Sequence, residues 1–277
     1  MTPAIDDYLK LVSPPESQWD LFKISLETCR IISPEIDFGW HYEYLARLTA
    51  AARDVCSPDG DLYSTINGIN EVLFESARVS ANDVDYFAPE NSYMNLVLET
   101  GKGIPITLSL LYREVASRIG LRLECVAMPG HFLLKTRTPS RELFIDSFHR
   151  GQICLADECL ELMQRITQTE SDAASPEFLK AASNRAVILR LLMNLKAIYR
   201  RNSANRLLLE VVERRIPILD DPLPEILERG LLKISLEDYP GALADLESFL
   251  GSTQNAEMQE VVEKQIDRIR KLASSKG

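Results

Sequence analysis

The residues of this sequence best suited to chemistry are a histidine and an aspartate in neighbouring strands. The segments HFLLKT (131–136) and ELFID (142–146) both have strand character, and a four-residue turn at 137–140 would place His131 directly opposite Asp146. Directly opposed side chains have Cβ atoms roughly 4.5–5.5 Å apart. A carboxylate at that distance accepts a hydrogen bond from one imidazole nitrogen and raises the basicity of the other. The spacing therefore predicts a general-base dyad of His131 and Asp146.

The elements expected to position this dyad are a helix and a small sheet. Residues 106–119 keep one apolar face at helical spacing, and Gly120 stands where a C-terminal cap belongs. Residues 121–128 then alternate as a strand, and a turn at 129–130 leads into the two strands of the dyad. This order predicts an α+β layer in which the helix packs on an antiparallel sheet.

The two ends of the chain differ from this middle part. Residues 1–90 show helical periodicity and hold 6 basic against 16 acidic residues, which accounts for the whole net charge of −10. In the last part, Gly230 and Ala242 match small positions of a tetratricopeptide pattern, and a degenerate copy begins near Asn194. We therefore expect three regions: an acidic helical region (1–90), the α+β core (91–181) and a repeat-like α-helical array (182–277).

The middle region resembles a known bacterial family. Residues 91–135, with the blocks GIPI and PGHFL, and the later LFIDSFHRG are similar to the transglutaminase-like core of the SirB-type invasion-regulator group, whose members carry C-terminal tetratricopeptide repeats. The resemblance implies a papain-like architecture with a Cys-His-Asp triad. It places the nucleophile on the first turn of the long helix, and it matches His131 to the histidine and Asp146 to the aspartate.

The nucleophile of that family does not match. Its thiol position falls near Pro105, and the window GIPITLS (103–109) contains no cysteine. Proline suits the first turn of a helix because it lacks the N–H that would be unsatisfied there. Without a thiolate, acyl transfer or peptide hydrolysis cannot run by the usual route of the family. The core is therefore interpreted as a degenerate one.

Two hydroxyls and five thiols are the possible substitutes. Thr107 and Ser109 lie in the first turns of the helix, where capping or a place on the helix face is the ordinary role of a hydroxyl. The cysteines form no CxxC pair and are expected to be reduced packing residues; they are Cys29, Cys56, Cys125, Cys154 and Cys159. We expect none of these thiols to reach His131, so Thr107 and Ser109 remain the candidate substitute nucleophiles.

The same segment also allows a third hypothesis, a metal site. His131, Asp146 and His149 together form a ligand set of two imidazoles and one carboxylate that suits a divalent metal. No further acid or cysteine at ligand spacing supports it, so our expectation is no metal and no cofactor. A buried His–Asp pair that only joins two strands, as a remnant of an ancestral site, also remains open.

Composition narrows the function classes. No Lys/Arg-rich stretch with interleaved aromatics suggests nucleic-acid binding, and no apolar run approaches the ~18 residues of a membrane span. The start of the chain lacks a basic segment followed by an apolar one, so we expect a cytoplasmic protein. The leading hypothesis is a non-catalytic transglutaminase-like protein that binds a protein or peptide partner through residues 182–277. The alternative is a cysteine-independent hydrolase or acyltransferase that uses the dyad with a substitute nucleophile.

Overall fold

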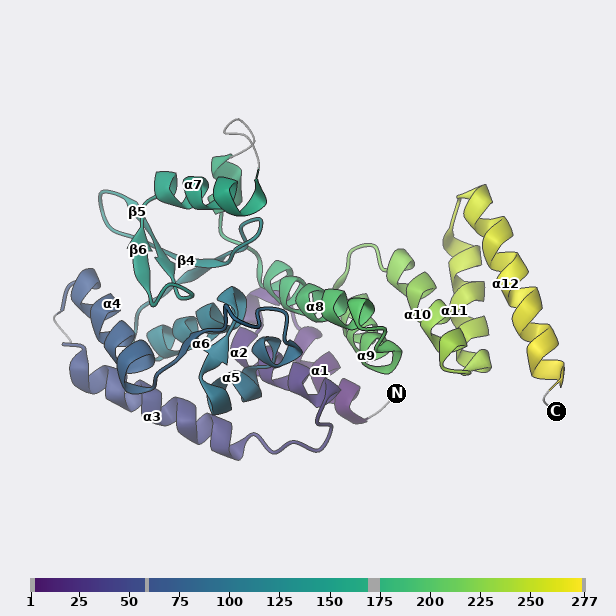
Figure 1. Ribbon diagram of the computed structural model, residues 1–277, viewed down its shortest axis with the longest axis horizontal. Coiled ribbons are helices and arrows are strands. Elements are labelled where there is room, and N and C mark those ends of the chain that lie inside the picture. The colour runs from purple at the N-terminus through teal and green to yellow at the C-terminus, as the bar shows by residue number, and fades with distance from the viewer. Residues whose placement is uncertain (1–2, 58–59, 169–174, 276–277) are drawn as a thin grey trace. The chain divides into compact units, whose positions relative to one another are not determined.

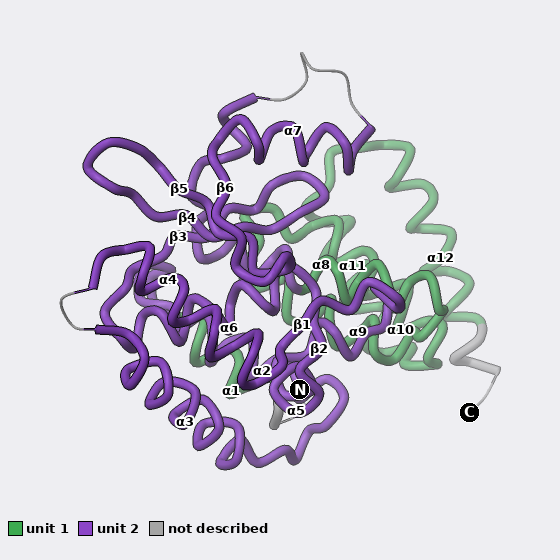
Figure 2. The backbone as a smooth tube through the Cα atoms, turned by 60° about the vertical axis from the view of Figure 1, so that its left-hand side comes forward, with its two compact units in different colours: residues 1–13, 192–277 green, residues 14–191 purple. Residues whose placement is uncertain are grey.

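The chain packs as two compact units in the computed structural model, which describes residues 3–57, 60–168 and 175–275. One unit comprises residues 14–191, and the other combines residues 1–13 with residues 192–277 (Figure 2). This division differs from the three regions expected from the sequence. The acidic helices pack in the same unit as the sheet, whereas the first helix packs with the last ones. In the described part of the chain, no helix has the length and apolarity that a membrane crossing requires.

The first part of the larger unit is helical, as its periodicity predicted. Its elements are η1 (Glu16–Gln18), α2 (Leu21–Glu27), η2 (Thr28–Ile31), α3 (Gly39–Val55), α4 (Leu62–Asn70), the π-helical η3 (Glu71–Ser76), η4 (Pro89–Ser92) and α5 (Met94–Thr100). Helices α2, α3, α4 and α5 all pack on α6 (Pro105–Arg118), which starts and ends one residue before the predicted helix. Because α6 is covered by so many elements, most of its side chains are buried.

The sheet of the larger unit has four antiparallel strands in the order β3-β4-β5-β6. They are β3 (Glu124–Val126), β4 (Leu133–Arg137), β5 (Glu142–Asp146) and β6 (Gln152–Cys154). Helix α6 packs on β4 and α7 (Ala156–Thr167) packs on β5, on opposite sides of the sheet in Figure 1. The prediction of a helix on a small sheet is confirmed, while β6 and the layer formed by α7 were not predicted.

A second, two-stranded sheet fixes the segment that precedes α6. Strands β1 (Ser80–Ala81) and β2 (Lys102–Gly103) pair in parallel. Between them, Asn91 accepts a hydrogen bond from the Asn82 amide and donates to the carbonyl of Asp85. These bonds hold residues 82–92 in place, and the carbonyl of Asn91 reaches the first turn of α6.

The smaller unit is an array of helices. After η6 (Pro176–Leu179) and α8 (Asn184–Arg201), which enters this unit at residue 192, follow α9 (Asn205–Arg215), η7 (Ile216–Ile218), α10 (Leu223–Ser235), α11 (Tyr239–Ser252) and α12 (Ala256–Ser275). Helix α10 packs on α9 and α11, and α11 packs on α12 (Figure 1). A Cβ atom on Gly230 would stand 3.0 Å from Leu246 Cδ2, and Ala242 is fully buried. Both are therefore the close-packing positions that the repeat pattern predicted.

The N-terminal helix α1 (Pro3–Val12) belongs to this array. The hydroxyl of the fully buried Tyr8 donates to the carbonyl of Arg214, 3.0 Å away. The Arg214 guanidinium also lies 5.9 Å from the centre of the Tyr8 ring. Contacts between residues so distant in the sequence leave no trace in local periodicity, which explains why residues 1–13 were expected to pack with the other acidic helices.

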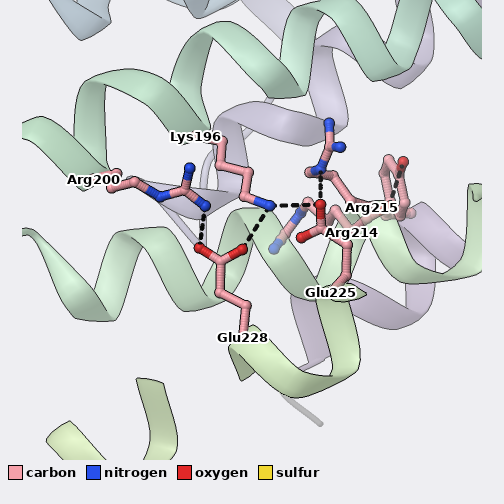
Figure 3. A network of polar contacts seen from close by, with 7 residues as sticks. Lys196, Arg200, Arg214, Arg215, Glu225 and Glu228 are labelled. Atoms are coloured by element: carbon pink, nitrogen blue, oxygen red, sulfur yellow. Dashed lines mark hydrogen bonds and ion pairs between the residues drawn. The ribbon is translucent and has the colours of Figure 1, made fainter. Parts of the chain in front are cut away.

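Buried ion pairs join α8, α9 and α10 inside the array (Figure 3). Lys196 Nζ lies 2.5 Å from Glu225 Oε1 and 2.6 Å from Glu228 Oε2. The same Glu225 oxygen accepts from Arg215 Nε at 2.9 Å, and Arg200 pairs with Glu228 at 2.5 Å. Lys196, Arg215 and Glu225 are all buried. Because buried charges are tolerated only when they are paired, this network fixes how the three helices meet.

Candidate functional site

His131 lies in the turn that leads into β4 rather than in the strand itself. Its backbone N–H donates to the carbonyl of Met128 at 3.1 Å, and Gly130 before it has a positive φ of 74°. A Cβ atom at Gly130 would also stand 2.5 Å from Ile166 Cγ2, so the turn needs glycine on both counts. This turn buries the His131 side chain under the end of the sheet.

Asp146 is the last residue of β5, and both of its carboxylate oxygens are occupied. Oδ1 accepts from the backbone N–H groups of Phe148 and His149, at 3.0 and 3.2 Å. Oδ2 lies 2.8 Å from His131 Nε2. The structure therefore brings together the two residues that the sequence paired.

The register that brings them together differs from the predicted one. Arg137 pairs with Glu142, so the turn covers residues 138–141, one residue later than expected, and the pairing shifts by two. The cause lies in Thr138, whose hydroxyl accepts from the N–H of Arg141 and whose own N–H donates to the Arg141 carbonyl. Directly opposed pairing of His131 and Asp146 was therefore wrong. Their contact survives because a shift of two residues keeps each side chain on its face.

His149 completes the cluster. Its Nδ1 atom lies 2.8 Å from Asp146 Oδ2, the oxygen that His131 also contacts. The loop that carries it runs through Arg150 and Gly151, which have φ values of 57° and 75°, and Gly151 N–H donates to the Asp146 carbonyl. This tight return places His149 over the carboxylate with its side chain 52% exposed. His149 thus lies in the site, next to the two residues with which the metal hypothesis had grouped it.

The electrostatics of the cluster keep Asp146 ionised. Burial alone would raise the pKa of this carboxyl, but the hydrogen bonds and charges of His131 and His149 outweigh burial and hold the pKa below its usual value. The carboxylate consequently accepts from both imidazoles at once. A dyad that serves a nucleophile uses such a carboxylate to orient one histidine; here it orients two.

Aromatic rings enclose the histidines. Phe148 lies edge-on to His131 and to His149, with ring centres 6.0 and 5.5 Å apart, and Tyr86 lies edge-on to Phe148 at 6.1 Å. Neither aromatic residue was among the site residues predicted from the sequence. Phe148 stands inside the DSFH motif and could have been noticed there. Tyr86 comes from the irregular segment before α6, where periodicity gives no signal.

The hydroxyls at the start of α6 are buried and show no access to a substrate. Thr107 Oγ1 accepts from the N–H of Ile104 at 3.1 Å and lies 2.8 Å from the carbonyl of Asn91, to which it donates. These are the contacts of a capping residue. Ser109 is fully buried, and its Oγ has no hydrogen-bond partner among the described residues. Neither hydroxyl makes a hydrogen bond to His131 in the described structure.

The thiols are also far from the arrangement a nucleophile needs. Burial raises the pKa of the Cys125 thiol to about 11 and that of Cys29 to about 12, so neither is a thiolate at neutral pH. A hydrogen bond with Cys159 lowers the pKa of the half-buried Cys154. Cys154 pairs with Phe144 in the β5–β6 ladder, on the same face as Asp146, and the negative charge of Asp146 opposes this lowering of the pKa. No thiol makes a hydrogen bond to His131 among the described residues.

Comparison with known proteins agrees with this architecture. Residues 40–193 match the transglutaminase-like superfamily, and residues 195–273 match a tetratricopeptide repeat family. A UPF0162 protein of Xylella fastidiosa is 32% identical over 195 residues, which cover 69% of each chain. A UPF0162 protein of Vibrio cholerae is 23% identical over 251 residues, covering 90% of this chain and 92% of that relative.

A eukaryotic protein shares only part of the chain. F-box only protein 21 of Mus musculus is 37% identical over 111 residues, which make up 37% of this chain and 18% of that protein. The similarity to the two bacterial proteins extends further, over 69% and 90% of this chain. The chain belongs to the transglutaminase-like superfamily, and within it to the UPF0162 proteins, with tetratricopeptide repeats at its C-terminal end.

Proposed function

We propose that this chain is a non-catalytic member of its superfamily that acts by binding a protein or peptide partner through the helices of residues 192–275. Tetratricopeptide arrays generally serve as interaction surfaces, which supports the binding role. The observation that carries the non-catalytic part is the start of α6. Its two hydroxyls are buried, that of Thr107 is held by backbone groups, and no cysteine is present.

Exposed apolar side chains support a docking role for the array. Met193, Leu231 and Val261 are large apolar residues with about half of their surface exposed, and they lie on α8, α10 and α12. If α8–α9 and α10–α11 are taken as helix pairs, α9 and α11 are the second helix of each pair, and α12 follows them. A repeat array presents the same helix of each pair on one extended surface. We infer that the partner contacts α8, α10 and α12.

We also propose that the protein is located in the cytoplasm. All five cysteines are free thiols, and this state is typical of a reducing cytoplasm.

The catalytic alternative, a hydrolase or acyltransferase using His131 and Asp146, requires a nucleophile that moves into reach of the His131 ring. Because Thr107 bonds two backbone groups, its recruitment would unmake the first turn of α6.

The docking role is tested by one substitution with a matched control. Leu231→Asp places a charge on α10, where the side chain is 46% exposed, and Val55→Asp places the same charge at the end of α3, where exposure is 45%. We expect Leu231→Asp to abolish the capture of specific partners from a lysate of the source cells, as measured by quantitative mass spectrometry. Val55→Asp should retain them. Equal capture by both variants would overturn the assignment of the docking surface.

A further inference from the structure

The three polar side chains of the candidate site are arranged like ligands of one ion. His131, Asp146 and His149 each offer one ligand atom, and these atoms all lie within 4.8 Å of one another. Two of the separations are 2.8 Å, from Asp146 Oδ2 to His131 Nε2 and to His149 Nδ1. The ligand atoms of a zinc ion bound at about 2.0–2.2 Å lie roughly 3–4 Å apart. Shifts of about an ångström would therefore bring all three to bonding distance.

The surroundings hold these atoms in position. The backbone N–H groups of Phe148 and His149 occupy Asp146 Oδ1, so the carboxylate presents Oδ2 to the histidines. Such outer hydrogen bonds orient metal ligands and affect metal affinity. The Phe148 ring lies edge-on against both imidazoles and limits their rotation. His131 and Asp146 are buried, whereas His149 is half exposed and gives the cluster one side open to solvent.

We propose that His131 Nε2, Asp146 Oδ2 and His149 Nδ1 bind one divalent transition-metal ion of the zinc type. The set combines two imidazoles with one carboxylate, and three protein ligands leave a fourth position for water or a ligand group. Both histidines coordinate as neutral rings. The site does not depend on the docking role proposed above.

The chain contains an internal comparison for this site. His41 is buried and its Nε2 lies 2.9 Å from Glu99 Oε1, with Trp40 and Phe38 edge-on to its ring. This is again an imidazole–carboxylate pair among aromatic rings, but no third ligand atom joins it among the described residues. The His41–Glu99 pair therefore serves as a control site, because it has an imidazole and a carboxylate but lacks the third ligand.

The experiment is a zinc titration of the chain of residues 1–277 after its metal has been removed with a chelator, and a competing indicator dye reports the free zinc. The Cys56→Ser/Cys154→Ser background is used because these are the two cysteines that are not fully buried. We expect one zinc ion per chain. His149→Asn should weaken the affinity at least about tenfold, because it removes a direct ligand. Glu99→Gln is the matched control, since Glu99 and His149 are the half-exposed members of their pairs, at 43% and 52%. It should bind zinc like the parent.

Two results would overturn the proposal. One is the absence of stoichiometric zinc binding by the parent chain, and the other is equal binding by His149→Asn. Cobalt(II) gives an independent readout, because its absorption spectrum is measured on the parent chain and needs no site variant that must itself fold. The parent chain should give the absorption of a four-coordinate site without a thiolate charge-transfer band, and the spectrum of hexaaquacobalt alone would contradict the site.

Discussion

Replacing Glu225 by glutamine is expected to destabilise the helical array by about 3–5 kcal/mol, because it takes one negative charge out of a buried ion-pair network. The substitution keeps the shape of the side chain but removes the negative charge that Lys196 and Arg215 share, at 2.5 and 2.9 Å. Both cations are almost fully buried, so water cannot replace the lost interaction. Urea denaturation followed by far-ultraviolet circular dichroism measures the loss.

The control for this prediction is the same substitution at an exposed ion pair. Glu247 lies 2.9 Å from Arg270, and both side chains are more than half exposed. Glu247→Gln should change the free energy of unfolding by no more than about 1 kcal/mol. Trp19 and Trp40 both belong to the unit of residues 14–191, so their fluorescence follows that unit separately. Similar losses for Glu225→Gln and Glu247→Gln would show that the buried network does not stabilise the array.

The second large effect is expected at Gly151, in the loop that carries His149. Gly151→Ala should lower the free energy of unfolding by about 2–4 kcal/mol, through a strained backbone and a steric clash. Gly151 has a φ of 75°, and an added Cβ would stand 1.9 Å from Asn70 Oδ1. Asn70 cannot move away freely, because it donates to the Gly151 carbonyl and accepts from the Tyr112 hydroxyl. Thermal and urea denaturation measure the effect.

A substitution at Gly120 separates the effect of backbone strain from that of the steric clash. It has a φ of 96°, but an added Cβ would have nothing within 4 Å. Gly120→Ala should therefore show the backbone strain alone, about 1–2 kcal/mol. If Gly151→Ala is no more destabilising than Gly120→Ala, the contact with Asn70 does not hold the loop.

Local patterns in the sequence predicted the local elements well. The helix expected at 106–119 is observed as Pro105–Arg118, and the strand expected at 142–146 is observed as Glu142–Asp146. Apolar spacing and the flanking proline and glycine determine such elements within a few residues of chain. The strand expected at 121–128 is limited to Glu124–Val126, because only those residues find partners in β4.

Features that depend on individual hydrogen bonds or on distant contacts were less predictable. The hairpin register depends on the bonds that Thr138 makes within its own turn, and turn length alone does not reveal them. The packing of α1 into the last helices depends on Tyr8 and Arg214, which are 206 residues apart. Within the site, the contact between His131 and Asp146 was predicted, whereas the shared oxygen that also binds His149 required the fold of the 147–151 loop.

The most direct test of a non-catalytic role is covalent trapping of the chain of residues 1–277, compared with its His131→Ala variant. A hydroxyl-directed fluorophosphonate and the thiol-directed reagent iodoacetamide are each followed by peptide mapping with mass spectrometry. A non-catalytic role predicts no fluorophosphonate adduct on Thr107 or Ser109, which are fully buried, and iodoacetamide labelling of Cys154 to the same extent in both proteins. A single residue that is modified rapidly in the wild-type chain and no longer in His131→Ala would contradict it, because His131 would then be activating a nucleophile.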